Sequence, residues 1–243
     1  MEPSVEMIKQ FAKTKRPGMT KYLDLFANYL TFYFWKLGLT PSQITYSWVI
    51  LQAFSTILLA FGNYYLSILG IFLFQFMFII DLCDGKLARL NSHLSDKVTK
   101  KPLLPKYLDR LGHYLNNSLL FIFLGVGVWQ QTGNLIYVII GLASAYFISL
   151  NKALTMNACW YKGDDEIKKI CSLYHGSHPR SNANSFRIFI FDIIRTEQMF
   201  NILFFAIILN FSKEVLILYT FLFFVELLRK IMKSYILLYK EDK

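Results

Sequence analysis

Long apolar stretches separated by shorter polar connections run through the chain from residue 43 onward. Six of these stretches are close to the 20 or so residues that a helix needs to cross a bilayer. The pattern predicts an all-α integral membrane protein with six transmembrane helices. The expected spans cover residues 43–62, 64–83, 110–131, 134–156, 196–212 and 214–232.

A segment before the first span has a different periodicity, from Tyr22 to Gly38. Apolar residues recur there every three or four positions, which is typical of an amphipathic helix. We expect this helix to lie in the membrane interface, and a soluble helix packed on the bundle is the alternative. The chain then divides into an N-terminal segment, residues 1–38, and a six-helix domain, residues 39–243. The apolar stripe comprises Leu23, Phe26, Ala27, Leu30 and Phe34, and the polar positions include Lys21, Asp24, Asn28 and Lys36.

Composition and charge agree with a membrane protein. Hydrophobic residues make up 55% of the 243 residues and charged residues 17%, against about 25% charged in soluble domains. In the six-span arrangement, 25 of the 26 Lys and Arg residues fall on one side of the membrane. This asymmetry predicts that both termini are cytoplasmic. The net charge of +10 therefore reflects topology, and we do not expect nucleic-acid binding.

Two acidic residues follow the apolar run of the second span. Asp81 and Asp84 are three positions apart, so they share one face of a helix. Ionised groups close to hydrocarbon are rare and usually functional. Two carboxylates this close repel each other unless a cation lies between them. The pair therefore indicates a metal site.

A second pair opens the third span, beyond a polar loop with two prolines. Asp109 and His113 are four positions apart and share a helical face. Because the second span ends on the side where the third begins, all four side chains can converge. Carboxylates favour Mg²⁺ or Mn²⁺ bound jointly with substrate phosphates, whereas zinc lacks a cysteine or second histidine at ligand spacing. Such a metal would neutralise charge in phosphoryl transfer.

These residues resemble a known family. Residues 81–89 read Asp-Leu-Cys-Asp-Gly-Lys-Leu-Ala-Arg, which is similar to the first half of the CDP-alcohol phosphotransferase signature, D-x-x-D-G-x-x-A-R followed by G-x-x-x-D-x-x-x-D. Every fixed position of that half matches. Residues 40–45, Thr-Pro-Ser-Gln-Ile-Thr, are similar to the family's T-P-N-x-x-T element. The resemblance covers most of the chain from about residue 40.

The resemblance implies a transferase that moves a phosphoalcohol from a CDP-linked donor to a hydroxyl acceptor and releases CMP. It also implies a cytoplasmic site, contact with membrane lipids and a homodimer. Phospholipid synthesis is the expected setting, and transfer of a small alcohol phosphate to a lipid or glycan is the alternative. By this resemblance, the metal would be held by Asp81, Asp84, Asp109 and His113. The nucleotide would be bound by Pro41, Thr45, Asp84, Gly85, Ala88 and Arg89.

The second half of the signature departs from the family pattern. Pro105 stands where the family has glycine, and 15 residues separate it from Arg89, more than in the usual pattern. His113 replaces the last aspartate, which in the family is taken to be the base that removes the acceptor's hydroxyl proton. A neutral imidazole, with an unperturbed pKa of about 6.5, can do the same. Either His113 is the base, which we favour because the remaining motif is intact, or the chain is a relative that binds CDP-alcohol without turnover.

Other polar residues have weaker interpretations. His175 and His178 have the spacing of a metal pair but lack a third ligand. A transporter is a competing class, although the acids lie at span ends and the two halves lack matching broken helices. Three basic residues near the expected cytoplasmic face could bind an acceptor phosphate. These residues are Lys152, Arg187 and Arg195. The alternative is topology-setting charge for Lys152 and Arg187, and an intrahelical pair with Asp192 for Arg195.

Overall fold

The computed structural model describes residues 4–10, 20–94, 103–160 and 196–241, and in these residues every regular element is an α-helix. The prediction of an all-α protein is therefore confirmed. Each predicted span corresponds to one helix, with ends that differ by up to 11 residues. The helices are α1 (Val5–Gln10), α2 (Thr20–Lys36), α3 (Pro41–Leu59), α4 (Tyr64–Leu94), α5 (Leu103–Thr132), α6 (Ile136–Trp160), α9 (Thr196–Ile208) and α10 (Ser212–Glu241).

Three of the described helices are long and apolar enough to cross a membrane. They are α4, the Tyr107–Thr132 part of α5 and the Ile136–Leu154 part of α6. A shorter apolar helix covers Gln198–Ile208. Helix α3 carries a run of hydroxyl and amide side chains, and α10 carries charges near both ends; neither is among these three helices. The arrangement of six spans remains a prediction.

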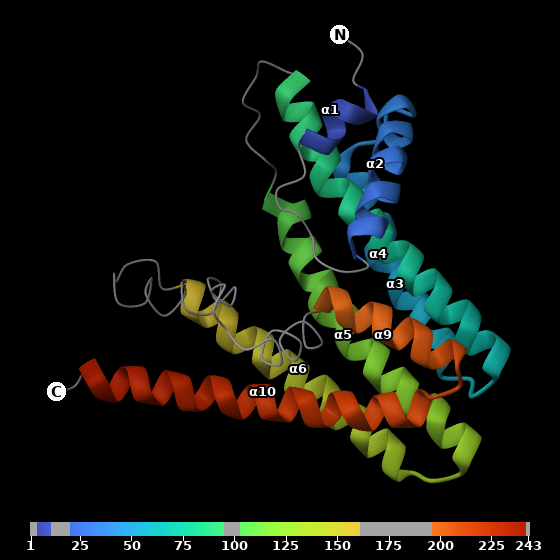
Figure 1. The fold of residues 1–243 in the computed structure, drawn as a ribbon, viewed down its shortest axis with the longest axis vertical. Coiled ribbons are helices and arrows are strands. Elements are labelled where there is room, and N and C mark those ends of the chain that lie inside the picture. Colours follow the sequence, from blue (N-terminus) through green and yellow to red (C-terminus); the bar gives the residue numbers. More distant parts are fainter. Residues whose placement is uncertain (1–3, 11–19, 95–102, 161–195, 242–243) are drawn as a thin grey trace.

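Helices α3, α4 and α5 form the long body of the molecule (Figure 1). Helix α4 contacts α2, α3 and α9, while α5 contacts α3 and α6. Helix α10 packs across α6 and extends away from the body toward the C-terminus. The functional motifs lie in the region where α3, α4 and α5 meet.

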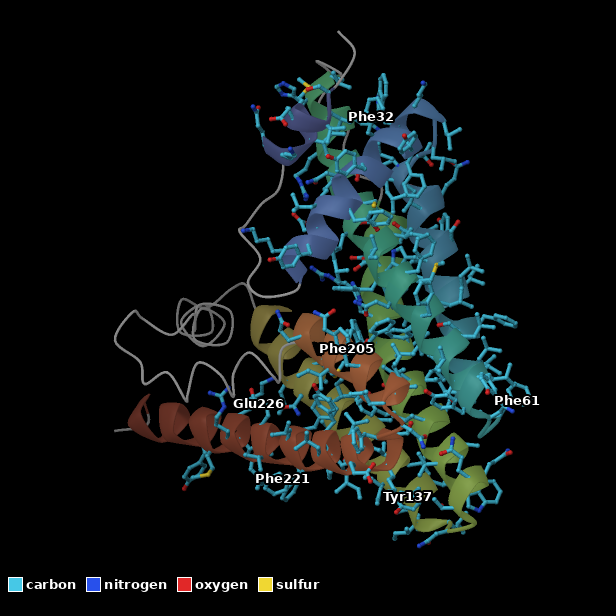
Figure 2. The ribbon with its side chains drawn as sticks, turned by 45° about the vertical axis from the view of Figure 1, so that its right-hand side comes forward. Phe32, Phe61, Tyr137, Phe205, Phe221 and Glu226 are labelled. Atoms are coloured by element: carbon cyan, nitrogen blue, oxygen red, sulfur yellow. The ribbon has the colours of Figure 1, made fainter. Side chains whose placement is uncertain are left out.

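The core between these helices is rich in aromatic side chains. Phe200 on α9 packs edge-on against Phe74 and Phe78 of α4. Many large apolar side chains also point outward, among them Phe61 and Phe221, which extend from the surface in Figure 2 and are more than half exposed. An outer surface this apolar is expected of a protein surrounded by lipid.

Helix α2 packs along α4 rather than standing alone, and its inward face differs in part from the predicted stripe. Ala27 is buried as expected, whereas Phe26 is 51% exposed. Asn28, expected among the outward polar positions, is buried. The reason is a lysine on α4, described below, which draws polar groups of α2 inward. The outward face is instead aromatic and apolar, with Tyr22, Leu25, Phe26, Tyr29 and Tyr33 each at least 42% exposed.

Candidate functional site

The start of α3 places a threonine of the predicted nucleotide site against the signature helix. Thr40 caps α3 in a reciprocal pair with Gln43, in which the Gln43 backbone N–H donates to Thr40 Oγ1 and the Thr40 N–H donates to Gln43 Oε1. Such a capping box fixes where a helix begins. One turn later, the Thr45 hydroxyl lies 3.0 Å from the Pro41 carbonyl oxygen and 2.8 Å from Asp84 Oδ2. The two motifs, far apart in sequence, meet at this carboxylate.

The second acidic pair also converges with the first. Asp81, Asp109 and His113 each offer a ligand atom, and these atoms all lie within 4.8 Å of one another. His113 Nε2 is 3.6 Å from Asp81 Oδ1 and 3.6 Å from Asp109 Oδ1. Two carboxylate oxygens and one imidazole nitrogen form a donor set that suits a divalent cation. We call these three residues the ligand group.

Asp84, predicted to be a fourth ligand, lies outside the ligand group in this structure. Its Oδ2 accepts hydrogen bonds from the Thr45 hydroxyl at 2.8 Å and from Trp48 Nε1 at 3.3 Å. Both donors come from α3, so the carboxylate of Asp84 is oriented toward α3. The sequence placed Asp81 and Asp84 on one helical face but could not show that α3 donates two hydrogen bonds to the second of them.

The signature helix presents its fixed and variable positions on different faces. The variable positions Leu82, Cys83, Lys86 and Leu87 are all buried. The fixed positions Asp81, Asp84, Gly85, Ala88 and Arg89 are all partly exposed. Nucleotide and metal ligands must be reachable, so the fixed positions lie on the face where binding is possible.

Gly85 makes room for an arginine of its own helix. A Cβ at Gly85 would come 3.3 Å from a guanidinium nitrogen of Arg89, one turn farther along α4. The guanidinium of Arg89 therefore lies over Gly85. A cation placed there suits a diphosphate.

Two predicted acceptor residues and the histidine pair lie outside the described part of the chain. These are Arg187, Arg195, His175 and His178. Lys152 is described and lies against the site: its Nζ donates to the His113 backbone carbonyl at 2.8 Å and is 5.3 Å from the ring centroid of Tyr114. Lys152 thus contacts His113, the residue that replaces the last aspartate of the family signature.

The family model of CDP-alcohol phosphatidyltransferases matches residues 38–170, more than half of the chain. The chain belongs to this family. The match contains α3, α4, α5 and α6, and therefore every side chain of the ligand group. Membership supports phosphoalcohol transfer from a CDP-alcohol as the reaction class. No curated protein matches the chain.

Lys86, a variable position of the family signature, joins α4 to α2. It is 2% exposed, and its Nζ lies 2.9 Å from Asp24 Oδ1 and 2.8 Å from the Asp24 carbonyl oxygen. It also donates to Asn28 Oδ1. Sequence analysis missed this contact, although Asp24 and Asn28 are four apart on one face of α2 and could have suggested a buried cation between them.

Trp48 is the second residue that sequence analysis missed. It is fully buried on α3, one turn beyond Thr45. Its indole N–H donates to Asp84 Oδ2, and its ring centroid lies 4.9 Å from that of His113, with 38° between the planes. An apolar residue on a buried helix face gives no sequence signal for such a role.

Proposed function

We propose that the protein is a metal-dependent membrane transferase that moves a phosphoalcohol from a CDP-linked donor to a hydroxyl acceptor and releases CMP. The observation that supports it most is the ligand group, with Asp81, Asp109 and His113 within 4.8 Å of one another, beside a carboxylate held by the family's threonine element. Phospholipid synthesis, with CDP-diacylglycerol as donor and a small polar alcohol as acceptor, is the proposed setting. Multi-pass membrane insertion, cytoplasmic termini and a homodimer belong to the same proposal.

The donor set fits Mg²⁺ or Mn²⁺, since both cations prefer carboxylate oxygens. Asp81 and Asp109 would hold the cation, and Asp84 offers its Oδ1, because its Oδ2 already accepts hydrogen bonds from Thr45 and Trp48. A cation bound there would neutralise the charge of the donor diphosphate. Gly85, Ala88, Arg89, Pro41 and Thr45 would line the nucleotide side.

His113 would act as the base. The acceptor oxygen attacks the phosphorus that carries the alcohol, the bond from this phosphorus to the CMP oxygen breaks, and the acceptor proton passes to His113 Nε2. Asp81 and Asp109, whose oxygens lie 3.6 Å from Nε2, would stabilise the imidazolium that forms. One nitrogen cannot bind a metal and accept a proton at the same time, so this role leaves the metal to the carboxylates.

CMP release by the purified protein tests the proposal. A panel of CDP-linked donors and hydroxyl acceptors is incubated with Mg²⁺ or Mn²⁺, and CMP is measured. We expect turnover in the parent protein and a loss of at least about 100-fold in Asp84→Ala, because the site loses a charged group that positions substrate. Glu214→Ala, which removes an exposed carboxylate at the start of α10, is the matched control and should keep parental activity.

Three results would contradict the proposal. Turnover by Asp84→Ala as fast as that of the parent protein would show that this site does not carry out the transfer. Nucleotide binding without CMP release would identify a non-catalytic relative. Ion flux through proteoliposomes without nucleotide would favour a transporter.

A further inference from the structure

Trp48 fills the space between the three helices that carry the candidate site. It projects from α3 and is fully buried. On α5, the residue it faces is Gly112, where an added Cβ would lie 3.1 Å from Trp48 Cη2 and 2.5 Å from Val49 Cγ2. The missing side chain at Gly112 therefore lets α3 and α5 approach closely beside His113.

The indole of Trp48 contacts one candidate functional group on each of the other two helices. Its N–H donates to Asp84 Oδ2 on α4 at 3.3 Å. Its ring packs on the imidazole of His113 on α5, with the centroids 4.9 Å apart. The carboxylate on the proposed nucleotide side and the proposed base thus share a single rigid neighbour.

The ring contact also suits the residue found at position 113. The face of an aromatic ring carries partial negative charge, so it accommodates an imidazole, neutral or protonated, better than a carboxylate. An aspartate there would place its charge against the indole face. Trp48 and His113 are therefore chemically matched.

We propose that Trp48 is a positioning residue of the transfer reaction, holding Asp84 through its indole N–H and His113 through its ring. The inference rests on the proposed function. Its two contacts serve different steps, so they can be separated by substitution. The N–H acts on the side where the donor binds, and the ring acts on the group that takes the proton.

Three variants separate the contacts, with CMP release as the assay. Trp48→Phe keeps an aromatic ring and loses the N–H, while Trp48→Leu loses both. Thr45→Val removes the other hydrogen bond to the same oxygen, Asp84 Oδ2. We expect each to raise the donor KM about tenfold, as for loss of one hydrogen bond to a charged group. Only Trp48→Leu should also lower kcat, again about tenfold, because the imidazole loses its fixed position.

Trp129→Phe is the matched control, since Trp129 lies at the far end of α5 and is 37% exposed; both of its constants should equal those of the parent. The inference is overturned if the donor KM and the kcat of Trp48→Leu both stay within twofold of the parent values. It is also overturned if Trp48→Phe and Trp48→Leu lower kcat equally. If Trp48→Leu is not recovered as folded protein, Trp48→Phe and Thr45→Val test the inference, because both should raise the donor KM by the same factor. Clearly different donor KM values in these two variants overturn the inference.

A measurement without turnover keeps this inference distinct from the proposed function. Mn²⁺ alone is titrated into the parent protein and Trp48→Phe, and tryptophan fluorescence is followed. A paramagnetic ion held by the carboxylates of Asp81 and Asp109 should quench Trp48 strongly, so the variant should lose most of the quenching. Equal quenching would overturn the placement of Trp48, whereas a parent that releases no CMP would overturn only the transferase.

Discussion

At the scale of single residues, His113 stands where the family signature has its last aspartate. The imidazole nitrogen Nε2 is equally distant from Asp81 Oδ1 and Asp109 Oδ1, at 3.6 Å. An aspartate at this position would add a third negative charge to the ligand group. Compared with an aspartate, His113 therefore lowers the affinity of the site for a hard cation and provides a neutral group that can accept a proton.

Two substitutions at this position give different expectations. His113→Ala removes the proposed base and should lower kcat by about 100-fold or more. His113→Asp restores the acid of the family signature, so it should reach half-maximal activity at a several-fold lower Mn²⁺ concentration, with a kcat below that of the parent because the carboxylate would face the indole of Trp48. CMP release measured against Mn²⁺ concentration checks both. An alanine variant with parental kcat would show that His113 has only a structural role.

At the scale of elements, the two faces of α4 make different contacts. One face carries the fixed signature positions toward α3 and α5. The other carries Cys83, whose Sγ lies 3.4 Å from the Ala27 carbonyl oxygen, and Lys86, which bonds Asp24. The variable positions Cys83 and Lys86 thus contact α2, while the fixed positions lie on the face of the proposed substrate site.

The buried Lys86–Asp24 pair should be important for attaching α2. Lys86→Met removes a buried ammonium group from beside the Asp24 carboxylate and Asn28 Oδ1, which should lower the free energy of unfolding by ~3 kcal/mol. Adding Asp24→Leu removes the carboxylate of the pair as well and should recover part of the loss. Thermal unfolding of the purified variants in detergent measures both effects.

The exposed Lys9–Glu6 pair on α1 is the control for this experiment. Both side chains are solvated, so Lys9→Met should change stability by less than about 1 kcal/mol. A loss in Lys86→Met no larger than that in Lys9→Met would mean that the buried pair does not anchor α2.

At the scale of the whole molecule, the surface and the charges indicate how the protein sits in a membrane. Large apolar side chains cover the outer faces of α3, α6 and α10, as expected of lipid-facing helices. The turn between α5 and α6, residues 133–135, has no basic residue. In the predicted topology this turn lies on the side opposite both termini.

Labelling of a single cysteine tests that topology. Asn134 is exposed in the α5–α6 turn, so Asn134→Cys, in a protein whose three native cysteines are replaced by serine, should react with a membrane-impermeant thiol reagent in intact cells. The same reagent should reach a cysteine at position 2 only after the cells are opened. The reverse pattern would place the termini outside.

The sequence by itself determined the helices and the meeting of α4 with α5. Apolar periodicity and run length are local properties, and because the second span ends on the side of the membrane where the third begins, Asp81 and Asp109 are expected at a similar level. The fixed signature positions likewise share a face because 3.6 residues make one turn.

Only the tertiary structure decided how the helices are rotated and how closely they approach. It separated Asp84 from the ligand group, turned Phe26 outward and Asn28 inward, and brought Trp48 between Asp84 and His113. These outcomes depend on how side chains from several helices fill a shared space. One example is Gly112, whose missing side chain leaves room for Trp48 and Val49. No single segment of sequence contains both sides of such a contact.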